Sequence, residues 1–492
     1  MKNARVKNNE PIATEKIPVA DYDEFLEEIV ALVSSPACHV ASYFALDAGD
    51  GAVKLVCCIA DDDAHDIAIL SSEVEKNGVL PSATAHAGVF ERFEREIAEN
   101  TDLVFDGHPW MKPLRTAPDD YPFYHMEGEE LHEVGVGPIH AGVIEPGHFR
   151  FVCNGEKVLH LEIMLGYQHR GVEDLFLEKR RLNQRAVLAE SIAGDTAVGH
   201  GVVFANAWEA LCGHGISRRC RLERTLASEL ERIAIHTGDL GAICGDVAYQ
   251  LGSAVYGRLR TPIINFMQRW CGNRLGKGCV RPFAQPFPFT RELGADLLGT
   301  LGAYERDFLE LSAHVKHFPS VLARLERTGV LTQAQAEEIG AVGMAARASN
   351  LRRDVRASHP YLEYGWLGHN PITKHHGDVL SRTQVRISEV EQSLEYARRL
   401  VAELEALPGE NAAAAPRRAA ANSMVVSLGE GWRGEICHVA VTDGRGELAR
   451  YKIKDPSFHN WMALALAVRG NEISDFPICN KSFNLSYSGH DL

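Results

Sequence analysis

Three long amphipathic stretches between residues 170 and 405 constrain the fold of this chain most strongly. In each of them apolar residues recur three or four positions apart, so that they fall on one face of an α-helix. The stripes are Leu222, Leu226, Leu230 and Ile233; Tyr304, Phe308, Leu311 and Val315; and Val390, Leu394, Ala397, Val401 and Leu404. A helix cannot bury such a stripe alone, so the sequence predicts a bundle of long helices packed on one another.

Shorter patterns precede this helical region. The segment DYDEFLEEIVALV predicts a helix and KLVCCIA predicts a buried strand, which together indicate a small α+β unit. Four prolines in GHPWMKPLRTAPDDYP, residues 107–122, interrupt both helical and strand patterns, and we therefore place a domain boundary after residue 120. The expected domains are a small α+β domain over residues 1–120 and a second domain over residues 121–492.

Strand patterns return after the helices. An alanine-rich segment at 406–422 indicates an exposed connection, and beyond it EICHVAVT and ELARYKIK flank the turn-forming DGRG, as in a β-hairpin. The expected fold class is therefore α+β, in which the second domain is mainly α-helical with peripheral β-strands.

Composition excludes several classes of function. The net charge of −15 would repel a phosphate backbone, so we expect no nucleic-acid partner. No apolar run approaches the roughly 20 residues that cross a bilayer, and the opening MKNARVKNNEPIATEK has no signal core. Eleven scattered cysteines fit a reducing compartment. We expect a cytoplasmic protein that reaches the membrane through partner subunits.

Several motifs occur in an order that is typical of one family. They are GPIHAGVIEPGHFRF at 137–151, LHLEIMLGYQHRGVEDLF at 159–176, LERTLASELERIAIH, RASNLRRDVRASHPYLEYGW, GDVLSRTQVRISEVEQSL and RGEICHVAVTDGRGELARYKIKDPSFHNW. From Tyr121 to Leu492 the chain resembles the large subunit of group 4 nickel-iron hydrogenases of the formate hydrogenlyase type, and more distantly the 49-kDa subunit of complex I. The segment before it, ending HPWMKPLR, resembles the 30-kDa subunit of complex I fused in front.

The resemblance also brings out an absence. Two Cys-x-x-Cys pairs bind the bimetallic centre of the nickel-iron enzymes, but no Cys-x-x-Cys occurs in this chain. Aligned on His200, the four positions hold Ala193, Thr196, Ser486 and Gly489. Alanine and glycine offer no ligand atom, and hydroxyl groups are poor ligands for nickel. We therefore expect no metal on this chain and no hydrogenase activity of its own; a metal site rebuilt from remote cysteines is the alternative.

Complex I also lacks these cysteines, and the resemblance implies a cavity that receives a quinone headgroup beside the iron–sulfur cluster of the neighbouring subunit. Reduction of a quinone needs proton donors near its carbonyl oxygens. The cavity candidates are His140, Glu145, His148, Asp195 and His200. His140 matches the histidine of the Gly-Pro-x-His strand of the family, whereas Gly194 stands where complex I has a tyrosine that contacts quinone. A histidine on an apolar segment, such as His200, is more often a buried structural residue than a catalytic one.

A second set of polar residues suggests proton transfer or coupling to membrane subunits. Its members are His169, Arg170, Glu173, Glu229, His236, Arg347, Asp354, Arg356, Asp378, Arg382 and Arg386. Three structural alternatives remain open: anchoring of a helix by the His169–Glu173 turn, a buried polar network for Glu229 and His236, and interhelical salt bridges for the rest. We interpret Asp61–Asp63 and His375–His376 as solvated surface.

The resemblance implies the nickel-free large subunit of a complex-I-like, energy-converting oxidoreductase at the membrane. The implied partners are an iron–sulfur small subunit, antiporter-like membrane subunits and other hydrophilic subunits. Electrons would pass from the partner's cluster to a quinone or another small acceptor and drive ion translocation, and this chain itself would hold no cofactor other than the quinone, if that is the acceptor. Two alternatives stay open, a hydrogenase with atypical metal ligands and a non-catalytic scaffold.

Overall fold

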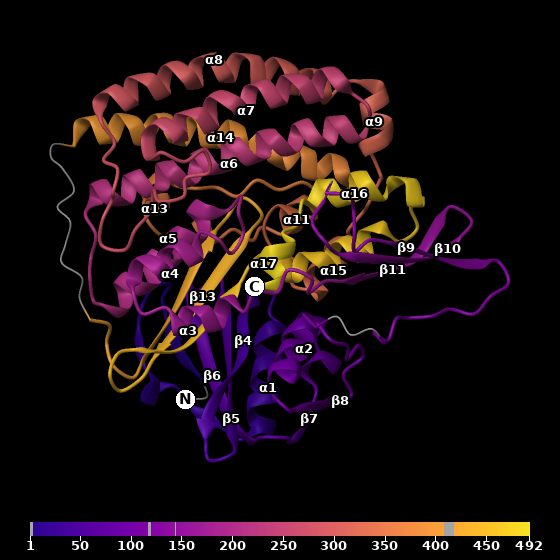
Figure 1. The fold of residues 1–492 in the computed structure, drawn as a ribbon, viewed down its shortest axis with the longest axis vertical. Coiled ribbons are helices and arrows are strands. Elements are labelled where there is room, and N and C mark those ends of the chain that lie inside the picture. The colour runs from indigo at the N-terminus through magenta and orange to yellow at the C-terminus, as the bar shows by residue number, and fades with distance from the viewer. Residues whose placement is uncertain (1–2, 117–119, 143, 408–417) are drawn as a thin grey trace.

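The computed structural model describes residues 3–116, 120–142, 144–407 and 418–492 (Figure 1). Its amino-terminal part is an antiparallel sheet covered by two helices, with strand order β1-β6-β5-β4 and with β3 added parallel to β6. The strands are β1 (Ala4–Val6), β3 (Val19–Ala20), β4 (Cys38–Gly49), β5 (Ala52–Asp61) and β6 (Asp66–Glu75). The helices are α1 (Tyr22–Val33) and α2 (Glu91–Asn100), and β7 (Val79–Pro81) pairs with β8 (Val104–Asp106) beside them. The predicted helix and strand of this part are confirmed as α1 and β5.

Long helices stack at the other end of the molecule, where Figure 1 shows α8, α7, α14 and α6. These four are α6 (Arg218–Asp246), α7 (Gln250–Cys271), α8 (Arg291–Val315) and α14 (Val379–Ala406). In contrast, α5 (Ala197–Leu211) packs on the sheet of β12 (Ser423–Glu430) and β13 (Glu435–Thr442). The three predicted apolar stripes lie on α6, α8 and α14, and every stripe residue is buried. The expected helical bundle is confirmed, because each stripe is covered by a neighbouring helix.

Short helices connect the layers. They are α3 (Val172–Glu178), α4 (Leu182–Ala189), α9 (Pro319–Leu325), α10 (Gln333–Glu338), α11 (Gly343–Ala348), α12 (Val355–Ser358), α13 (Tyr364–Leu367), α15 (Ser457–Val468), α16 (Phe476–Phe483) and α17 (Tyr487–Asp491). None of the helices in the described part of the chain is both long enough and apolar enough to cross a membrane.

Two further sheets complete the fold. One has the order β11-β10-β9, from β9 (Leu131–Val136), β10 (His148–Asn154) and β11 (Lys157–Met164). The other has the order β14-β13-β12-β2, from β2 (Ile12–Ala13), β12 (Ser423–Glu430), β13 (Glu435–Thr442) and β14 (Leu448–Lys454). The predicted hairpin is confirmed as β13 and β14. The overall class is α+β, as expected, but β12 and β13 are buried along their whole length and are not peripheral, because α5 covers the sheet.

The amino-terminal part is joined to the rest by main-chain pairing and by a shared core. Ile12 and Ala13 pair with Met424 and Ser423 of β12. Phe44 belongs to the same cluster of buried side chains as the stripe residues of the helices. The division at residue 120 therefore stays a prediction. Of the expected connection at 406–422, residues 408–417 lie outside the described part of the chain.

Two local expectations differ from the structure. The Gly-Pro-x-His segment at 137–140 is a loop after β9 and not a strand, since Pro138 has no N–H for a ladder and Gly137 has a φ of 86°. Asp62 is only partly solvated, because its carboxylate lies 3.6 Å from Nδ1 of His39 and 3.3 Å from Nε2 of His359. His375 and His376 are exposed, as expected.

Candidate functional site

The four positions that the resemblance predicts to replace metal-binding cysteines are all buried in the structure. Ala193 and Thr196 lie in the loop before α5, and Ser486 and Gly489 lie at the start of α17. Ser486 caps α17 by accepting a hydrogen bond from the Gly489 amide at 2.8 Å. The Thr196 hydroxyl accepts one from Arg433 at 3.2 Å. Both hydroxyl groups are therefore committed to contacts within the protein.

The carboxylate of Asp455 occupies the space beside Gly489. A Cβ at position 489 would stand 2.7 Å from Cγ of Asp455. The same carboxylate accepts a hydrogen bond from the Ser457 amide at 2.8 Å and lies 3.0 Å from Nε2 of His200. Burial opposes its ionisation, but the hydrogen bond and charge of His200 outweigh burial and hold the pKa of Asp455 below its ordinary value.

His200 extends the row of hydrogen bonds from Asp455 to the sheet. Its Nδ1 lies 3.1 Å from Nε2 of His438, and Nδ1 of His438 lies 2.8 Å from the hydroxyl oxygen of Tyr451. Burial holds the pKa of His438 well below its ordinary value. His200 is thus a fully buried member of a hydrogen-bonded row.

Asp195 forms a two-pronged ion pair with Arg433. The two carboxylate oxygens accept from the Arg433 guanidinium at 2.6 and 2.7 Å, and the guanidinium carbon lies 3.9 Å from the ring centre of Trp432. Trp432 also donates to the Asp195 carbonyl at 3.0 Å. Because Asp195 is 34% exposed and Gly194 is exposed, this side of the cluster reaches the surface. We call Asp195, His200, Arg433, His438 and Asp455 the tail cluster.

Glu231 adds a buried acid next to the tail cluster. It projects from α6 and accepts hydrogen bonds from the amides of Val198 at 2.7 Å and Gly199 at 3.1 Å, in the first turn of α5. Burial raises its pKa to about 8, so the carboxyl carries a proton at neutral pH. Glu231 and Asp195 also line one small cavity of about 10 Å³, which is room for about one water molecule.

His140, after β9, and His148, the first residue of β10, each contact a main-chain carbonyl group. Nε2 of His140 lies 2.8 Å from the Gly147 carbonyl, and Nδ1 of His148 lies 3.0 Å from the Gly137 carbonyl. Glu145 is exposed. In the described part of the chain no hydrogen bond or ion pair joins these three residues to Asp195 or His200, so the five cavity candidates split into two groups.

His169 and Arg170 of the predicted His169–Glu173 turn make contacts with α17 and with the loop before α5. Nδ1 of His169 lies 2.7 Å from the Asp491 carbonyl, and the Arg170 amide donates to Leu492 at 2.7 Å. The Arg170 guanidinium donates to the carbonyl groups of Ser191 (2.7 Å), Ile192 (3.1 Å) and Ser488 (3.1 Å). These two residues therefore anchor α17 and the loop before α5, whereas the expected capping of the following helix, α3, is absent among the described side chains.

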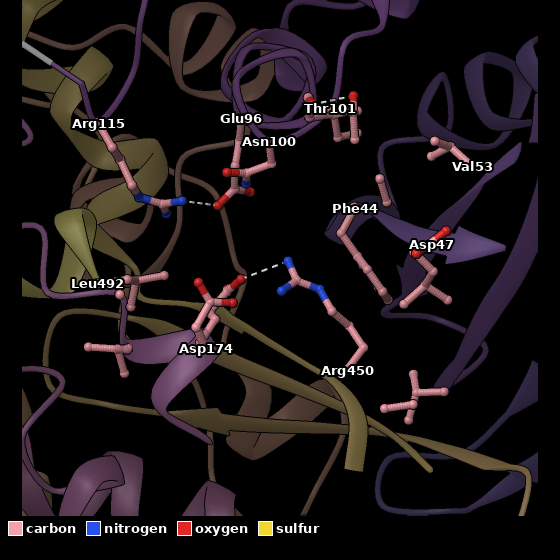
Figure 2. Close-up of a pocket in the computed structure, with 18 of the residues that line it drawn as sticks. Phe44, Asp47, Val53, Glu96, Asn100, Thr101, Arg115, Asp174, Arg450 and Leu492 are labelled. Atoms are coloured by element: carbon pink, nitrogen blue, oxygen red, sulfur yellow. Dashed lines mark hydrogen bonds and ion pairs between the residues drawn. The ribbon is translucent and has the colours of Figure 1, made fainter. Parts of the chain in front are cut away.

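Glu173 instead belongs to a charged cluster in a cleft of about 670 Å³ between the amino-terminal sheet and α3. Its carboxylate pairs with Lys452 at 2.9 Å and with Arg450 at 2.8 Å. Burial opposes ionisation, but these two cations outweigh it and hold the pKa of Glu173 at about 2. Figure 2 shows Arg450 reaching toward this group and Arg115 pairing with Glu96 on the opposite wall.

A larger set of buried charges lies between α6, α14 and β12, centred on Glu389. The Glu389 carboxylate accepts from Arg347 at 2.6 Å and from Arg232 at 3.3 Å, and lies 2.8 Å from Nε2 of His236. Arg347 reaches on to Glu430 at 2.7 Å. Each of these side chains is at most 1% exposed.

The other predicted members join the same set. Asp354 pairs with Arg356 at 2.7 Å and lies 3.0 Å from Nε2 of His369. Glu229 accepts from the Tyr364 hydroxyl at 2.6 Å and from the Ser393 hydroxyl at 2.5 Å, and lies 3.6 Å from Arg356. The ionic network consists of Glu229, Arg232, His236, Arg347, Asp354, Arg356, His369, Glu389 and Glu430.

The ionic network holds one more carboxyl group than guanidinium groups. Burial opposes the ionisation of Glu229, Asp354 and Glu389, but the neighbouring arginines outweigh it and keep their pKa values below the ordinary range. Glu430 is the exception, because burial and the charge of Asp354 raise its pKa to about 7. Burial lowers the pKa values of both histidines. The network is therefore neutral when Glu430 is protonated and carries a negative charge when it is not.

Three predicted residues lie apart from this network. Asp378 caps α14, accepting from the amides of Ser381 at 2.8 Å and Arg327 at 2.9 Å. Arg382 donates to the carbonyl groups of Gly377 at 2.6 Å and Gly329 at 2.9 Å and to the Ser482 hydroxyl at 2.8 Å, and burial lowers its pKa to about 10. Arg386 pairs with Asp239 at 3.1 Å.

Sequence reasoning missed several residues of both clusters. They are Arg232, His369, Glu389, Glu430, Arg433, His438 and Asp455, and Glu231 beside the tail cluster was missed as well. A signal existed for two of them: Glu389 lies three residues after Arg386 on the buried side of α14, and Glu430 ends the apolar run SMVVSLG. Arg433 and Asp455 follow strands and carry no local pattern.

The residues present do not fit a nickel-iron centre. In the described residues no group of three or more His, Cys, Asp or Glu side chains is placed to hold a metal ion. Two of the four ligand positions, Ala193 and Gly489, have no ligand atom, and Asp455 fills the space beside Gly489.

Comparison with known proteins places the chain among respiratory and hydrogenase subunits. The family model for the 49-kDa subunit of respiratory-chain NADH dehydrogenase matches residues 246–491. Hydrogenase-4 component G of Escherichia coli is 26% identical over 482 residues, which cover 92% of this chain and 81% of that protein. The alpha subunit of the membrane-bound hydrogenase of Pyrococcus furiosus is 28% identical, over 72% of this chain and 85% of the relative. An NADH-quinone oxidoreductase subunit of Dehalococcoides mccartyi is 30% identical, over 70% of this chain and 93% of the relative.

Proposed function

Because this chain belongs to the family of the 49-kDa subunit of respiratory-chain NADH dehydrogenase, related to the large subunits of group 4 hydrogenases, we propose that it is a nickel-free large subunit of a complex-I-like, energy-converting oxidoreductase. It is a subunit of an oxidoreductase complex and assembles with other subunits. In this proposal it passes electrons from an iron–sulfur cluster on a partner small subunit to a quinone or another small acceptor.

The observation that carries the proposal is the contact between Asp455 and Gly489. Asp455 fills the space that a side chain at position 489 would need, and Ser486 and Thr196 already use their hydroxyl groups. A thiolate-bound metal pair therefore has neither ligands nor room. The remaining chemistry of the site is that of acids, bases and ion pairs.

Reduction of a quinone takes up two electrons and two protons, and the site offers a buried proton donor. Glu231 is protonated at neutral pH and lines the same small cavity as Asp195, whose side chain is 34% exposed. In the proposal Glu231 supplies one proton, which Asp195 relays to the acceptor while Arg433 keeps Asp195 in place, and solvent at the exposed side of Asp195 supplies the second proton. The two electrons come from the partner's cluster. Protonation of Glu430 then changes the charge of the ionic network and biases membrane subunits toward ion translocation.

The partners follow from the same proposal. The 137–148 loop packs on Tyr487 through Gly147 and carries Ile139, which is 90% exposed, so it offers an apolar contact to the iron–sulfur small subunit. We place the complex at the cytoplasmic face of the membrane, bound through antiporter-like membrane subunits and other hydrophilic subunits.

Nickel content decides between this proposal and a hydrogenase with atypical ligands. The intact complex is purified with this subunit, and nickel and hydrogen uptake are measured on the same preparation. We expect nickel far below one atom per complex and no hydrogen uptake. Stoichiometric nickel bound to this subunit would overturn the proposal.

Turnover decides between a working site and a scaffold. Asp195→Asn and Glu231→Gln keep the shape of each side chain but remove the acid. We expect each variant to lower quinone reduction at least tenfold in assembled complexes, while the exposed Glu395→Gln on α14 leaves it unchanged. Unchanged turnover in both site variants, with normal assembly, establishes the scaffold instead.

A further inference from the structure

A second cleft of about 420 Å³ lies between α2 and α15, apart from the tail cluster and the ionic network. One wall carries the aromatic rings of Trp110, Tyr121 and His160, and the other carries Met462 and Leu466 of α15. A cleft of this size with mostly apolar walls and a few polar groups is the usual form of a small-molecule site. None of the residues assigned to the proposed function lines it.

The polar group of this cleft is Arg92, a buried cation that lacks a direct carboxylate partner. Arg92 is 9% exposed and donates to Nε2 of His490, a neutral acceptor, at 3.1 Å. Its Nε has no hydrogen-bond partner among the described residues and lies 3.8 Å from Glu91, whose carboxylate is already bound by Arg95 at 2.7 Å. Burial lowers the pKa of Arg92 to about 10, which shows how poorly its charge is compensated.

His160 supplies a second free donor. Arg469 donates to its Nδ1 at 3.2 Å, so the ring proton lies on Nε2, which has no partner among the described residues. The other acid of this wall is neutralised, because Glu162 pairs with Lys112 at 2.7 Å. The cleft therefore combines unmatched donors with apolar walls. Its lining arginines, Arg92, Arg95 and Arg469, are equal in number to its glutamates, Glu91, Glu162 and Glu338, and Lys112 beside it adds one positive charge.

We propose that this cleft binds a small organic anion, whose carboxylate or phosphate group pairs with Arg92 and whose apolar body lies between the aromatic wall and α15. An anion without such a body would leave the walls unfilled, and a neutral molecule would leave Arg92 uncompensated. The hydrogen bond from Arg92 to His490 connects the cleft to α17, the helix of Gly489. An anion bound to Arg92 is thus connected through His490 to α17, although it does not enter the tail cluster.

Calorimetric titration of the full chain tests the proposal with four kinds of probe. Benzoate and octanoate carry a carboxylate on an aromatic or an aliphatic body, phenyl phosphate carries the other head group, benzyl alcohol lacks the charge, and acetate and inorganic phosphate lack the body. We expect at least one of the first three to bind ten times or more tightly than benzyl alcohol, acetate and inorganic phosphate. The ranking of benzoate against phenyl phosphate identifies the head group.

Two variants assign the binding to this cleft. Arg92→Gln keeps a donor for His490 but removes the charge, and we expect it to weaken binding at least tenfold. Ala465→Leu fills the cleft from α15 while leaving Arg92 intact, and we expect a loss of similar size. Arg450→Gln, which removes a cation from the other cleft, is the matched control and should bind as the unaltered protein does.

Three results would overturn the proposal: no binding of any of the three anions up to their solubility limits, equal binding of benzyl alcohol, or unchanged binding in Ala465→Leu. If Arg92→Gln fails to fold, the Ala465→Leu result decides alone, since it keeps the ion pairs of α2. None of these measurements depends on electron transfer, so failure here leaves the proposed function untouched.

Discussion

The tail cluster and the ionic network are both buried and polar, but they are built on opposite principles. In the tail cluster each charge has a fixed counterpart: Arg433 holds Asp195 with two hydrogen bonds, and Asp455 faces His200 and a backbone amide. The ionic network holds an extra carboxyl, Glu430, whose pKa of about 7 leaves its protonation undecided at neutral pH. The tail cluster is thus held by fixed pairs, whereas the charge of the ionic network changes with the protonation of Glu430.

Removal of Glu389 should cause the largest loss of folding stability, because it takes away the central carboxylate of the ionic network. Glu389→Ala leaves Arg347, Arg232 and His236 without their shared acceptor, so we expect the free energy of unfolding to fall by about 3–5 kcal/mol. Urea denaturation measures it. Glu395→Ala, on the exposed side of the same helix, is the control and should change stability by less than about 0.5 kcal/mol. Equal losses in the two variants would mean that the network does not stabilise the fold.

Replacement of Glu231 should give the next largest effect, which appears as a change in how folding stability depends on pH. Its pKa in the folded protein is raised to about 8, above the value of about 4.3 for an unfolded chain. The contribution of protonated Glu231 to the free energy of unfolding is therefore fully present below the pKa that Glu231 has in the unfolded chain. It is lost as pH rises, by about 1.4 kcal/mol per pH unit at most, until pH passes about 8.

Glu231→Gln should remove this slope and keep the acceptor for the Val198 and Gly199 amides. Between pH 6 and pH 8 we expect the variant to gain about 2–3 kcal/mol relative to the unaltered protein, measured by denaturation at each pH. A parallel pair of stability curves would show that Glu231 ionises normally.

Gly489 tests whether the tail cluster is really full. In Gly489→Ala the new Cβ stands 2.7 Å from Cγ of Asp455, and we expect a loss of about 1–3 kcal/mol. Gly299 on α8 has open space around it, so Gly299→Ala should be neutral or stabilising by up to about 1 kcal/mol. If Gly489→Ala matches that control in thermal unfolding, the site has room that the structure does not show.

Ser486 should give the smallest effect. Ser486→Ala removes the cap of the short helix α17, for an expected loss of about 1 kcal/mol, and Ser486→Thr should retain most of it. Hydrogen exchange of the α17 amides measures the effect locally. Protection that is unchanged in the alanine variant would assign the position of α17 to His169 and Arg170 alone.

The sequence predicted what depends on neighbours along the chain and missed what depends on distant partners. The helices of the Leu222, Tyr304 and Val390 stripes and the β13–β14 hairpin were predictable because periodicity and turn residues are local signals. Asp378 was expected in the network but caps α14, although an acid directly before the apolar VL already indicates a cap.

The composition of the clusters was not predictable in the same way. Asp195 was a candidate, but its partner Arg433 comes from a turn that is adjacent only in the folded chain. The same holds for Asp455, which reaches Gly489 from the end of β14. Which carboxyl keeps its proton depends on burial and on the balance of several charges, and no single residue pattern encodes that balance.

The pairing of β2 with β12 has a consequence for how the chain is made. Residues 8–14 are synthesised long before their partners, which lie between Asn422 and Leu428. In a nascent chain β2 therefore stays unpaired until β12 has been synthesised, and contacts so distant in sequence form slowly. Truncation before β12 would leave β2 without its partner strand, so we expect prematurely terminated chains to aggregate or be degraded and not to accumulate as a folded amino-terminal fragment.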